Sequence, residues 1–158
     1  MSDASRTFVR EAVEEDLETV AAMLKMLGQH VGANPRVTAK DLAAYGPSGR
    51  RYFEILVAEV EGRILGITLY SIFFSAWRGR PGIFVSDLYV DDQARGRGLG
   101  TELLRAAIAK ELSRGCAYLK LDVAKENETG LGYYRKRGFT LSDSDHVMIL
   151  EEDRMRGL

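Results

Sequence analysis

One glycine-rich turn constrains the fold of this chain more than any other stretch of its sequence. It reads QARGRGLGTELL at residues 93–104, and it joins a strand-like run at 83–90 to a helix-like run at 101–114. Glycine has no side chain, so a turn built from it lets another group approach the backbone closely. The fold must therefore contain a strand, an open loop and a helix in this order, with room for a ligand at the loop.

The residues of this turn favour an anionic ligand. The first-turn N–H groups of a helix have no partner within the helix, and the macrodipole adds roughly half a positive charge there. Gly96, Gly98 and Gly100 leave room for a phosphate, and Arg95 and Arg97 can add charge-assisted hydrogen bonds. The alternative is a plain glycine-rich turn with two solvated arginines.

Two nucleotide-binding motifs compete for the same turn. A P-loop requires Gly-Lys-Ser/Thr, and Gly100-Thr101-Glu102 lacks the lysine. A dinucleotide fingerprint requires glycine at position 101, although Asp122 lies near the right distance for a ribose-binding acid. Antiparallel strands precede the loop and little chain follows it, so a doubly wound dinucleotide fold is disfavoured.

Hydrophobic periodicity and turn residues predict the other elements. We expect strands at 7–11, 53–60, 64–74, 83–90, 117–123, 139–141 and 146–150, and helices at 14–27, 38–45, 101–114 and 126–137. Thr38 with Asp41 resembles a capping box, and Gly115 is placed to end a helix. The predicted fold class is α/β: a mixed, mostly antiparallel sheet with flanking helices and one parallel βαβ pair, 83–90 with 117–123.

Composition narrows the class of protein. At 158 residues, with no repeat or linker, the chain is expected to form one domain, 1–158. A net charge of −1 argues against a nucleic-acid binder that relies on positive charge. Cys116 is the one cysteine and the two histidines lie far apart, which gives a metal site little support. The sequence shows no signal-peptide core and no membrane-length apolar run, so we expect a cytoplasmic protein.

Three segments together resemble the GNAT N-acetyltransferase superfamily. Arg95-Gly-Arg-Gly98-Leu-Gly100 matches the family signature Arg/Gln-x-x-Gly-x-Gly/Ala, "SDLYV" at 86–90 precedes it, and "NETGLGYYRKRGF" at 127–139 follows. The similarity extends over nearly the whole chain, and by eye it is closest to the diamine and thialysine N-acetyltransferases. It implies an acetyl-CoA-dependent enzyme that acetylates a primary amine of a small molecule and forms a homodimer.

The resemblance also implies where acetyl-CoA binds. The pyrophosphate would lie on the backbone from Gly96 to Thr101, and the peptide-like pantetheine arm would pair with Leu88, Tyr89 and Val90. This pairing requires the strands at 83–90 and 117–123 to splay apart. The residues implied in cofactor binding are Leu88, Tyr89, Val90, Arg95, Gly96, Arg97, Gly98, Leu99, Gly100, Thr101 and Asn127. From local sequence alone, Asn127 is equally an N-cap of the following helix.

The catalytic groups are inferred by the same resemblance. Tyr134 aligns with the family's catalytic tyrosine and is the expected general acid, and its neighbour Tyr133 is the residue expected to pack. The diamine enzymes carry Leu-Glu-Asp where this chain has Val85-Ser86-Asp87, so the glutamate is replaced by a poor base. A water chain ending at Asp87 or at Glu54 is one interpretation, and a purely structural Asp87 is the other. Alternation predicts Ser86 and Asp87 on opposite faces of the strand.

The acceptor is expected near "SAWRGR" at 75–80. Trp77 resembles an aromatic segment of the diamine enzymes, and the alternative is an aromatic plug at a strand end; Ser86 is the second expected acceptor contact. The segment carries Arg78 and Arg80 and no acid, so we expect an amino-acid-like amine to be favoured over a polyamine. The alternative function is a non-catalytic acyl-CoA-binding or sensing module.

Overall fold

The computed structural model describes residues 7–157. The chain divides into two compact parts, one ending at Asp122 and the other beginning at Val123. The first part contains the sheet and three helices. The second part contains two short helices.

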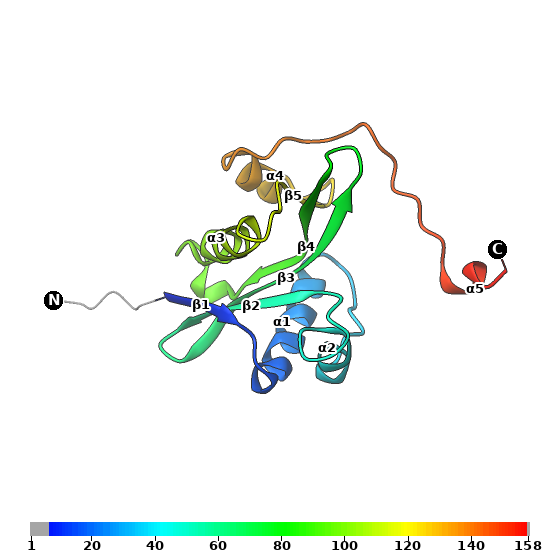
Figure 1. Ribbon diagram of the computed structural model, residues 1–158. Helices are drawn as coiled ribbons and strands as arrows, with labels where there is room; N and C mark the ends of the chain where they lie inside the picture. The colour runs from blue at the N-terminus through cyan, green and yellow to red at the C-terminus, as the bar shows by residue number, and fades with distance from the viewer. Residues whose placement is uncertain (1–6, 158) are drawn as a thin grey trace. The chain divides into compact units, whose positions relative to one another are not determined.

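The first part is built on a five-stranded sheet whose spatial order follows the sequence (Figure 1). Its strands are β1 (Thr7–Glu11), β2 (Glu54–Val60), β3 (Arg63–Ser75), β4 (Arg80–Val90) and β5 (Leu119–Leu121). The neighbouring pairs from β1 to β4 are antiparallel, and β4 with β5 is parallel. The predicted α/β class with a mixed sheet and a parallel βαβ pair is therefore confirmed.

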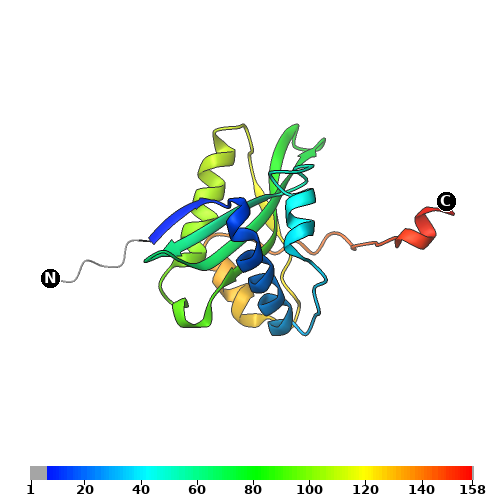
Figure 2. The same ribbon diagram turned by 90° about the horizontal axis from the view of Figure 1, so that it is seen from below.

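Helices lie on both faces of this sheet. They are α1 (Leu17–His30), which follows the 3-10 turn Glu14–Asp16, α2 (Ala39–Tyr45), and α3 (Leu99–Leu112). In Figure 1, α3 lies above the sheet and α1 and α2 lie below it; Figure 2, seen from below, shows α1 running across the strands. The predicted capping box of α2 forms, because the Asp41 N–H donates to Thr38 Oγ1 and the Thr38 N–H donates to Asp41 Oδ2.

The two faces of the sheet bury different sets of side chains. The α1 face buries an apolar cluster of strand and helix residues: Leu17, Val20, Leu24, Ile55, Val57, Ile67, Leu69 and Tyr89. On the α3 face, Leu103 and Leu104 are buried, and Leu103 approaches so closely that a Cβ at Gly66 would lie 3.1 Å from it. Alternation along β3 separates the two sets, as the period of two in a strand requires.

The second part contains α4 (Glu128–Arg135) and α5 (Glu152–Met155). The predicted strands at 139–141 and 146–150 are wrong, since the structure assigns no strand to these residues. A strand is stable when its backbone N–H and C=O groups pair with a neighbouring strand, and sequence pattern alone does not supply that neighbour. The apolar side chains that suggested the last strand, Val147, Met148 and Ile149, are exposed.

Other boundaries shift by a few residues from the sequence-based expectation. The helix expected at 101–114 begins at Leu99, inside the glycine-rich turn, and the strand expected at 117–123 shortens to β5. Gly115 follows the end of α3 with φ +100°, as its predicted capping role requires. Among residues 7–157, no helix combines the length and the apolar character needed to cross a membrane.

Candidate active site

The glycine-rich turn opens directly onto the N-terminus of α3. Gly96 and Gly98 adopt φ values of +76° and +80°, and Gly98 is the N-cap residue of the helix. A Cβ placed at either glycine would meet nothing within 4 Å, so the space above this backbone is open. Leu99 is buried beneath the turn and fixes it to the core. The structure thus combines left-handed glycines, an exposed backbone and a helix N-terminus, as an anion site requires.

The side chain of Arg95 is held at the rim of this turn by groups from three segments. Its Nε donates to the Val90 carbonyl at 3.2 Å, and its Nη2 lies 2.9 Å from Asp92 Oδ1. Nη2 is also 3.5 Å from Nδ1 of His30, at the end of α1, and the imidazole packs edge-on against the Tyr89 ring. Sequence reasoning gave His30 no role, because 65 residues separate it from Arg95 and no local pattern joins them.

The strand before the turn has one free edge where the sequence predicted a splayed pair. β5 pairs with β4 from Ile83 to Val85, and among the described residues no strand pairs with that edge beyond Val85. On the other edge, Leu88, Tyr89 and Val90 remain paired with β3. A free strand edge presents backbone N–H and C=O groups to which an extended, peptide-like chain can bind.

A β-bulge lies where the β4–β5 pairing stops. Leu69 is opposite Asp87 and Tyr70 is opposite Val85, so Ser86 is the extra residue of β4. The Ser86 hydroxyl donates to the Leu69 carbonyl at 3.3 Å, and Thr68 Oγ1 donates to the Asp87 carbonyl at 3.0 Å. Because its partner Leu69 belongs to the α1 face, Asp87 lies on that face too. Bulges redirect side chains near functional sites, and strict alternation could not predict this one.

The other proposed end of a water chain, Glu54, lies on the opposite face of the sheet. Glu54 forms ion pairs with Arg51 at 2.7 Å and with Lys110 of α3 at 3.5 Å. Beside it, the buried Tyr70 hydroxyl donates to Glu111 Oε1 at 2.9 Å, and burial raises the pKa of Tyr70. The sheet therefore separates Glu54 from Asp87, and of these two carboxylates only Asp87 lies on the α1 face.

Beyond the bulge, the α1 face carries aromatic rings and two cations. Phe73 and Tyr118 pack edge-on with centroids 5.4 Å apart, and the Arg78 guanidinium stacks over Tyr118 at 4.1 Å. The Lys120 ammonium lies 4.7 Å from the Phe73 centroid and 5.7 Å from that of Phe84. We call Phe73, Arg78, Phe84, Tyr118 and Lys120 the aromatic–cationic face.

Two residues expected near the acceptor do not join this face. Trp77 is fully exposed at the tip of the β3–β4 hairpin, with 100% of its surface accessible. The Arg80 guanidinium donates through Nε and Nη2 to the Gly115 carbonyl. Sequence reasoning missed Lys120, since its place beside Phe84 depends on the parallel register between β4 and β5.

The remaining predicted residues belong to the second part of the chain. Asn127 is the N-cap of α4, and its Oδ1 accepts from the Gly130 N–H at 2.9 Å. The Tyr134 ring packs edge-on against Tyr133 and Phe139, and burial raises the pKa of Tyr134. Arg137 stacks over the Tyr133 ring at 3.4 Å. Tyr134 thus packs against two rings, although Tyr133 was the residue expected to pack, and the role of Tyr134 as general acid stays a prediction.

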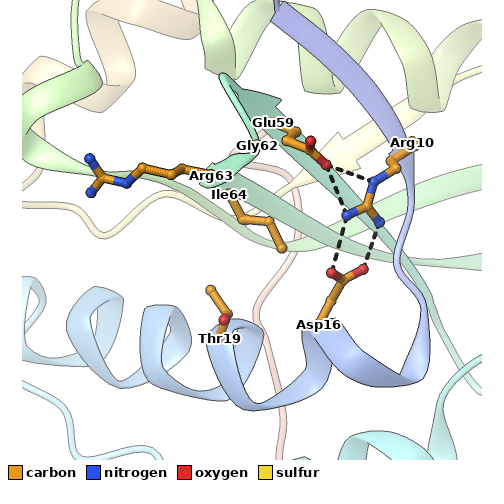
Figure 3. Close-up of a pocket in the computed structure, with 7 residues that line it drawn as sticks. All are labelled: Arg10, Asp16, Thr19, Glu59, Gly62, Arg63 and Ile64. Carbon is orange, nitrogen blue, oxygen red and sulfur yellow. Dashed lines mark hydrogen bonds and ion pairs between the residues drawn. The ribbon is translucent and has the colours of Figure 1, made fainter.

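A cavity of about 390 Å³ lies beside the β2–β3 turn and the start of α1 (Figure 3). Arg10 bridges Asp16 and Glu59 along its wall, and the Arg63 side chain points away from them. Because Arg10 and Arg63 together balance the charges of Asp16 and Glu59, this cavity offers a ligand little net charge. Among residues 7–157, no group of His, Cys, Asp or Glu is arranged to hold a metal ion.

Comparison with known proteins agrees with this geometry. The model of the "Acetyltransferase (GNAT) family" matches residues 8–139. The chain is 26% identical to the Bos taurus thialysine N-epsilon-acetyltransferase, covering 95% of both chains. It is 30% identical to the L-methionine sulfoximine/L-methionine sulfone acetyltransferase of Pseudomonas paraeruginosa, covering 85% of this chain and 80% of that protein.

Solved structures also resemble this chain over most of its length. A Trypanosoma brucei acetyltransferase superposes with a TM-score of 0.72 at 28% identity, covering 92% of this chain and all of that one. An integron cassette protein from V. cholerae superposes with a TM-score of 0.78 at 19% identity, covering 96% of both chains. The latter similarity concerns the fold alone.

Proposed function

Because the chain belongs to the GNAT family and is an acetyl-CoA-dependent N-acetyltransferase, we propose that it acetylates the primary amine of a small, amino-acid-like molecule. The observation that carries acetyl-CoA binding at this site is the open glycine turn at the N-terminus of α3, next to the free edge of β4. Thialysine and methionine sulfoximine, which the names of two relatives contain, are both amino acids.

The residues of the glycine turn suit the phosphates of acetyl-CoA, which supplies the acetyl thioester. Nothing would obstruct a phosphate over Gly96 and Gly98, and the first-turn N–H groups of α3 face that space. Leu88, Tyr89 and Val90 would hold the pantetheine arm through the strand edge that β5 leaves free. Arg95 would bind phosphate from the rim of the turn, held there by Asp92.

Acetyl transfer also requires two proton transfers, one from the acceptor amine and one to the departing sulfur. An amine of pKa near 10.4 is mostly protonated at pH 7, and removing its proton costs about 4–5 kcal/mol. We assign this step to Asp87 through a water chain, since Asp87 lies at the bulge of β4, where the pairing with β5 stops, whereas Glu54 lies on the other face of the sheet. We assign proton donation to the departing sulfur to Tyr134, whose raised pKa keeps its hydroxyl protonated at neutral pH.

The family match spans both compact parts of the chain, since residues 8–139 extend past Asp122. This supports a single N-acetyltransferase domain over residues 1–158. A homodimer remains a prediction from the resemblance, and a cytoplasmic location remains a prediction from the sequence.

The first test measures CoA release from acetyl-CoA with a panel of primary amines, using a thiol reagent. We expect release with at least one amino acid. Binding of acetyl-CoA by calorimetry with no release from any amine would favour the non-catalytic acyl-CoA-binding module instead.

Two pairs of variants locate the site. Gly98→Val should weaken acetyl-CoA binding at least tenfold, whereas Gly62→Val, with a similar φ of +74° in the β2–β3 turn, controls for backbone strain.

Tyr134→Phe should lower kcat by roughly 10²-fold while preserving acetyl-CoA binding, and Tyr133→Phe should affect stability more than turnover. A fully active Tyr134→Phe variant would exclude Tyr134 as the acid.

A further inference from the structure

Two cations on the aromatic–cationic face have no acidic partner. Within residues 7–157, neither Arg78 nor Lys120 lies within 4.0 Å of a carboxylate oxygen, although several other Arg and Lys side chains there form ion pairs. Both cations rest instead on ring faces, Arg78 over Tyr118 and Lys120 over Phe73 and Phe84. Aromatic contacts orient a cation without neutralising it, so the positive charge of this face stays available to an anion.

The rings are held in place by close packing. A Cβ on Gly82 would lie 2.6 Å from the Tyr118 ring, so the ring covers the one residue of β4 that has no side chain. Phe73 is opposite Gly82 in the β3–β4 ladder, and its ring packs against Tyr118. The cations are therefore supported by a rigid surface, which lowers the entropic cost of binding a ligand there.

Asp87 shares this face of the sheet with the cations. Phe84 is opposite Ser71 and Asp87 is opposite Leu69, so the two β4 residues are about 7 Å apart along the strand. Lys120 is the parallel partner of Phe84 on the neighbouring strand, about 4.8 Å to the side. An amine close to Asp87 and a carboxylate close to Lys120 would thus belong to one small molecule.

We propose that Lys120, with Arg78, binds the carboxylate of the acceptor and selects amines that carry one. This inference rests on the proposed acetyltransferase function and assigns its acceptor specificity. Arg80 has no part in it, because its guanidinium is bound to the Gly115 carbonyl. A diamine or polyamine would place a second positive charge beside Lys120 and Arg78, and Coulomb repulsion disfavours that complex.

The experiment compares two acceptors that differ by one carboxylate: S-(2-aminoethyl)-L-cysteine and bis(2-aminoethyl) sulfide. For the wild-type enzyme we expect kcat/KM to favour the amino acid at least tenfold. Lys120→Gln should lower kcat/KM for the amino acid about thirtyfold, chiefly through KM, and leave the diamine unchanged or improved. Lys120→Arg should retain most of the preference.

Arg105→Gln is the control, since it removes one positive charge from the exposed surface of α3 on the opposite face of the sheet. Calorimetry with the amino acid and CoA gives a readout independent of turnover, and Lys120→Gln should weaken this binding while Arg105→Gln should not. Equal losses for both acceptors in Lys120→Gln, or a wild-type preference for the diamine, would overturn the inference. If no amine releases CoA, the proposed function itself fails, which is a separate outcome.

Discussion

Two clusters of charged side chains in the first part of the chain differ in whether the protein supplies a counter-ion for the cation. Arg10 on β1 is bound by Asp16 at 2.6 Å and by Glu59 at 3.0 Å, and so joins β1, the turn before α1, and β2 (Figure 3). Arg78 and Lys120 lie on aromatic rings, with no carboxylate in reach among the described residues. In the first, which we call the Arg10 cluster (Arg10, Asp16 and Glu59), the protein itself supplies the counter-ions. In the second, no residue from 7 to 157 supplies one.

These two clusters should respond differently to the loss of a charged side chain. Removing one partner of a buried ion pair strongly destabilises the folded protein, because the remaining charge is left poorly solvated. A cation on an exposed aromatic face contributes less to folding, so its removal has little effect on stability. We therefore expect the Arg10 cluster to govern stability and the aromatic–cationic face to govern acceptor choice.

The largest expected loss of stability comes from a substitution in the Arg10 cluster. Asp16, whose side chain is 9% exposed, accepts from Arg10 and from the Val13 N–H at 2.8 Å. Asp16→Ala should lower the free energy of unfolding by about 3 kcal/mol, because it leaves Arg10 with one carboxylate and removes a cap. Urea denaturation measures the change, and kcat at a permissive temperature should be retained.

The matched control is Glu102→Ala, which removes an exposed carboxylate paired with Arg105 on α3. This change should cost at most about 1 kcal/mol. If Asp16→Ala and Glu102→Ala were equally mild, the Arg10 cluster would have no special structural role and the contrast would fail.

The next largest loss of stability is expected from a substitution beside the Tyr118 ring, which supports Arg78. Gly82→Ala would place a methyl group 2.6 Å from the Tyr118 ring, and Tyr118 would have to turn away from Gly82. We expect a loss of about 1–2 kcal/mol from overpacking, a changed near-ultraviolet circular dichroism signal, and a smaller preference for carboxylate-bearing acceptors. Gly132→Ala in α4, where a Cβ meets nothing within 4 Å, should be neutral or stabilising.

The sequence predicted those features that depend on local pattern. The glycines of 96–100 placed the helix N-terminus, and the strand–helix–strand spacing predicted the parallel pair. Lys120 and His30 were missed, because their partners are distant in sequence and depend on the register of the sheet. The Ser86 bulge breaks the alternation on which strand reasoning relies. At 146–150, an apolar pattern predicted a strand, but pattern does not specify a pairing partner.

Protonation of Asp16 in acid should lower the free energy of unfolding by less than Asp16→Ala does, since protonation leaves the packing of the side chain intact. The hydrogen bonds from Arg10 hold the pKa of Asp16 below its usual value. A lowered folded-state pKa adds stability above the unfolded-state value, near 3.9, and that stability is lost as pH falls through the folded-state pKa. Thermal melts from pH 6 to pH 2.5 should therefore fall less steeply for Asp16→Asn than for the wild type.

The smallest expected change in stability is at Lys120. Its ammonium is exposed and contacts only ring faces among the groups described, so Lys120→Gln should alter the free energy of unfolding by at most about 1 kcal/mol. Chemical denaturation measures this value in parallel with that of Asp16→Ala. A loss comparable to that of Asp16→Ala would mean that Lys120 holds β5 to the sheet, and its effect on acceptors would then follow from a distorted strand. A small loss together with an altered acceptor preference would show that the unbalanced charge is retained for the ligand, since folding gains little from it.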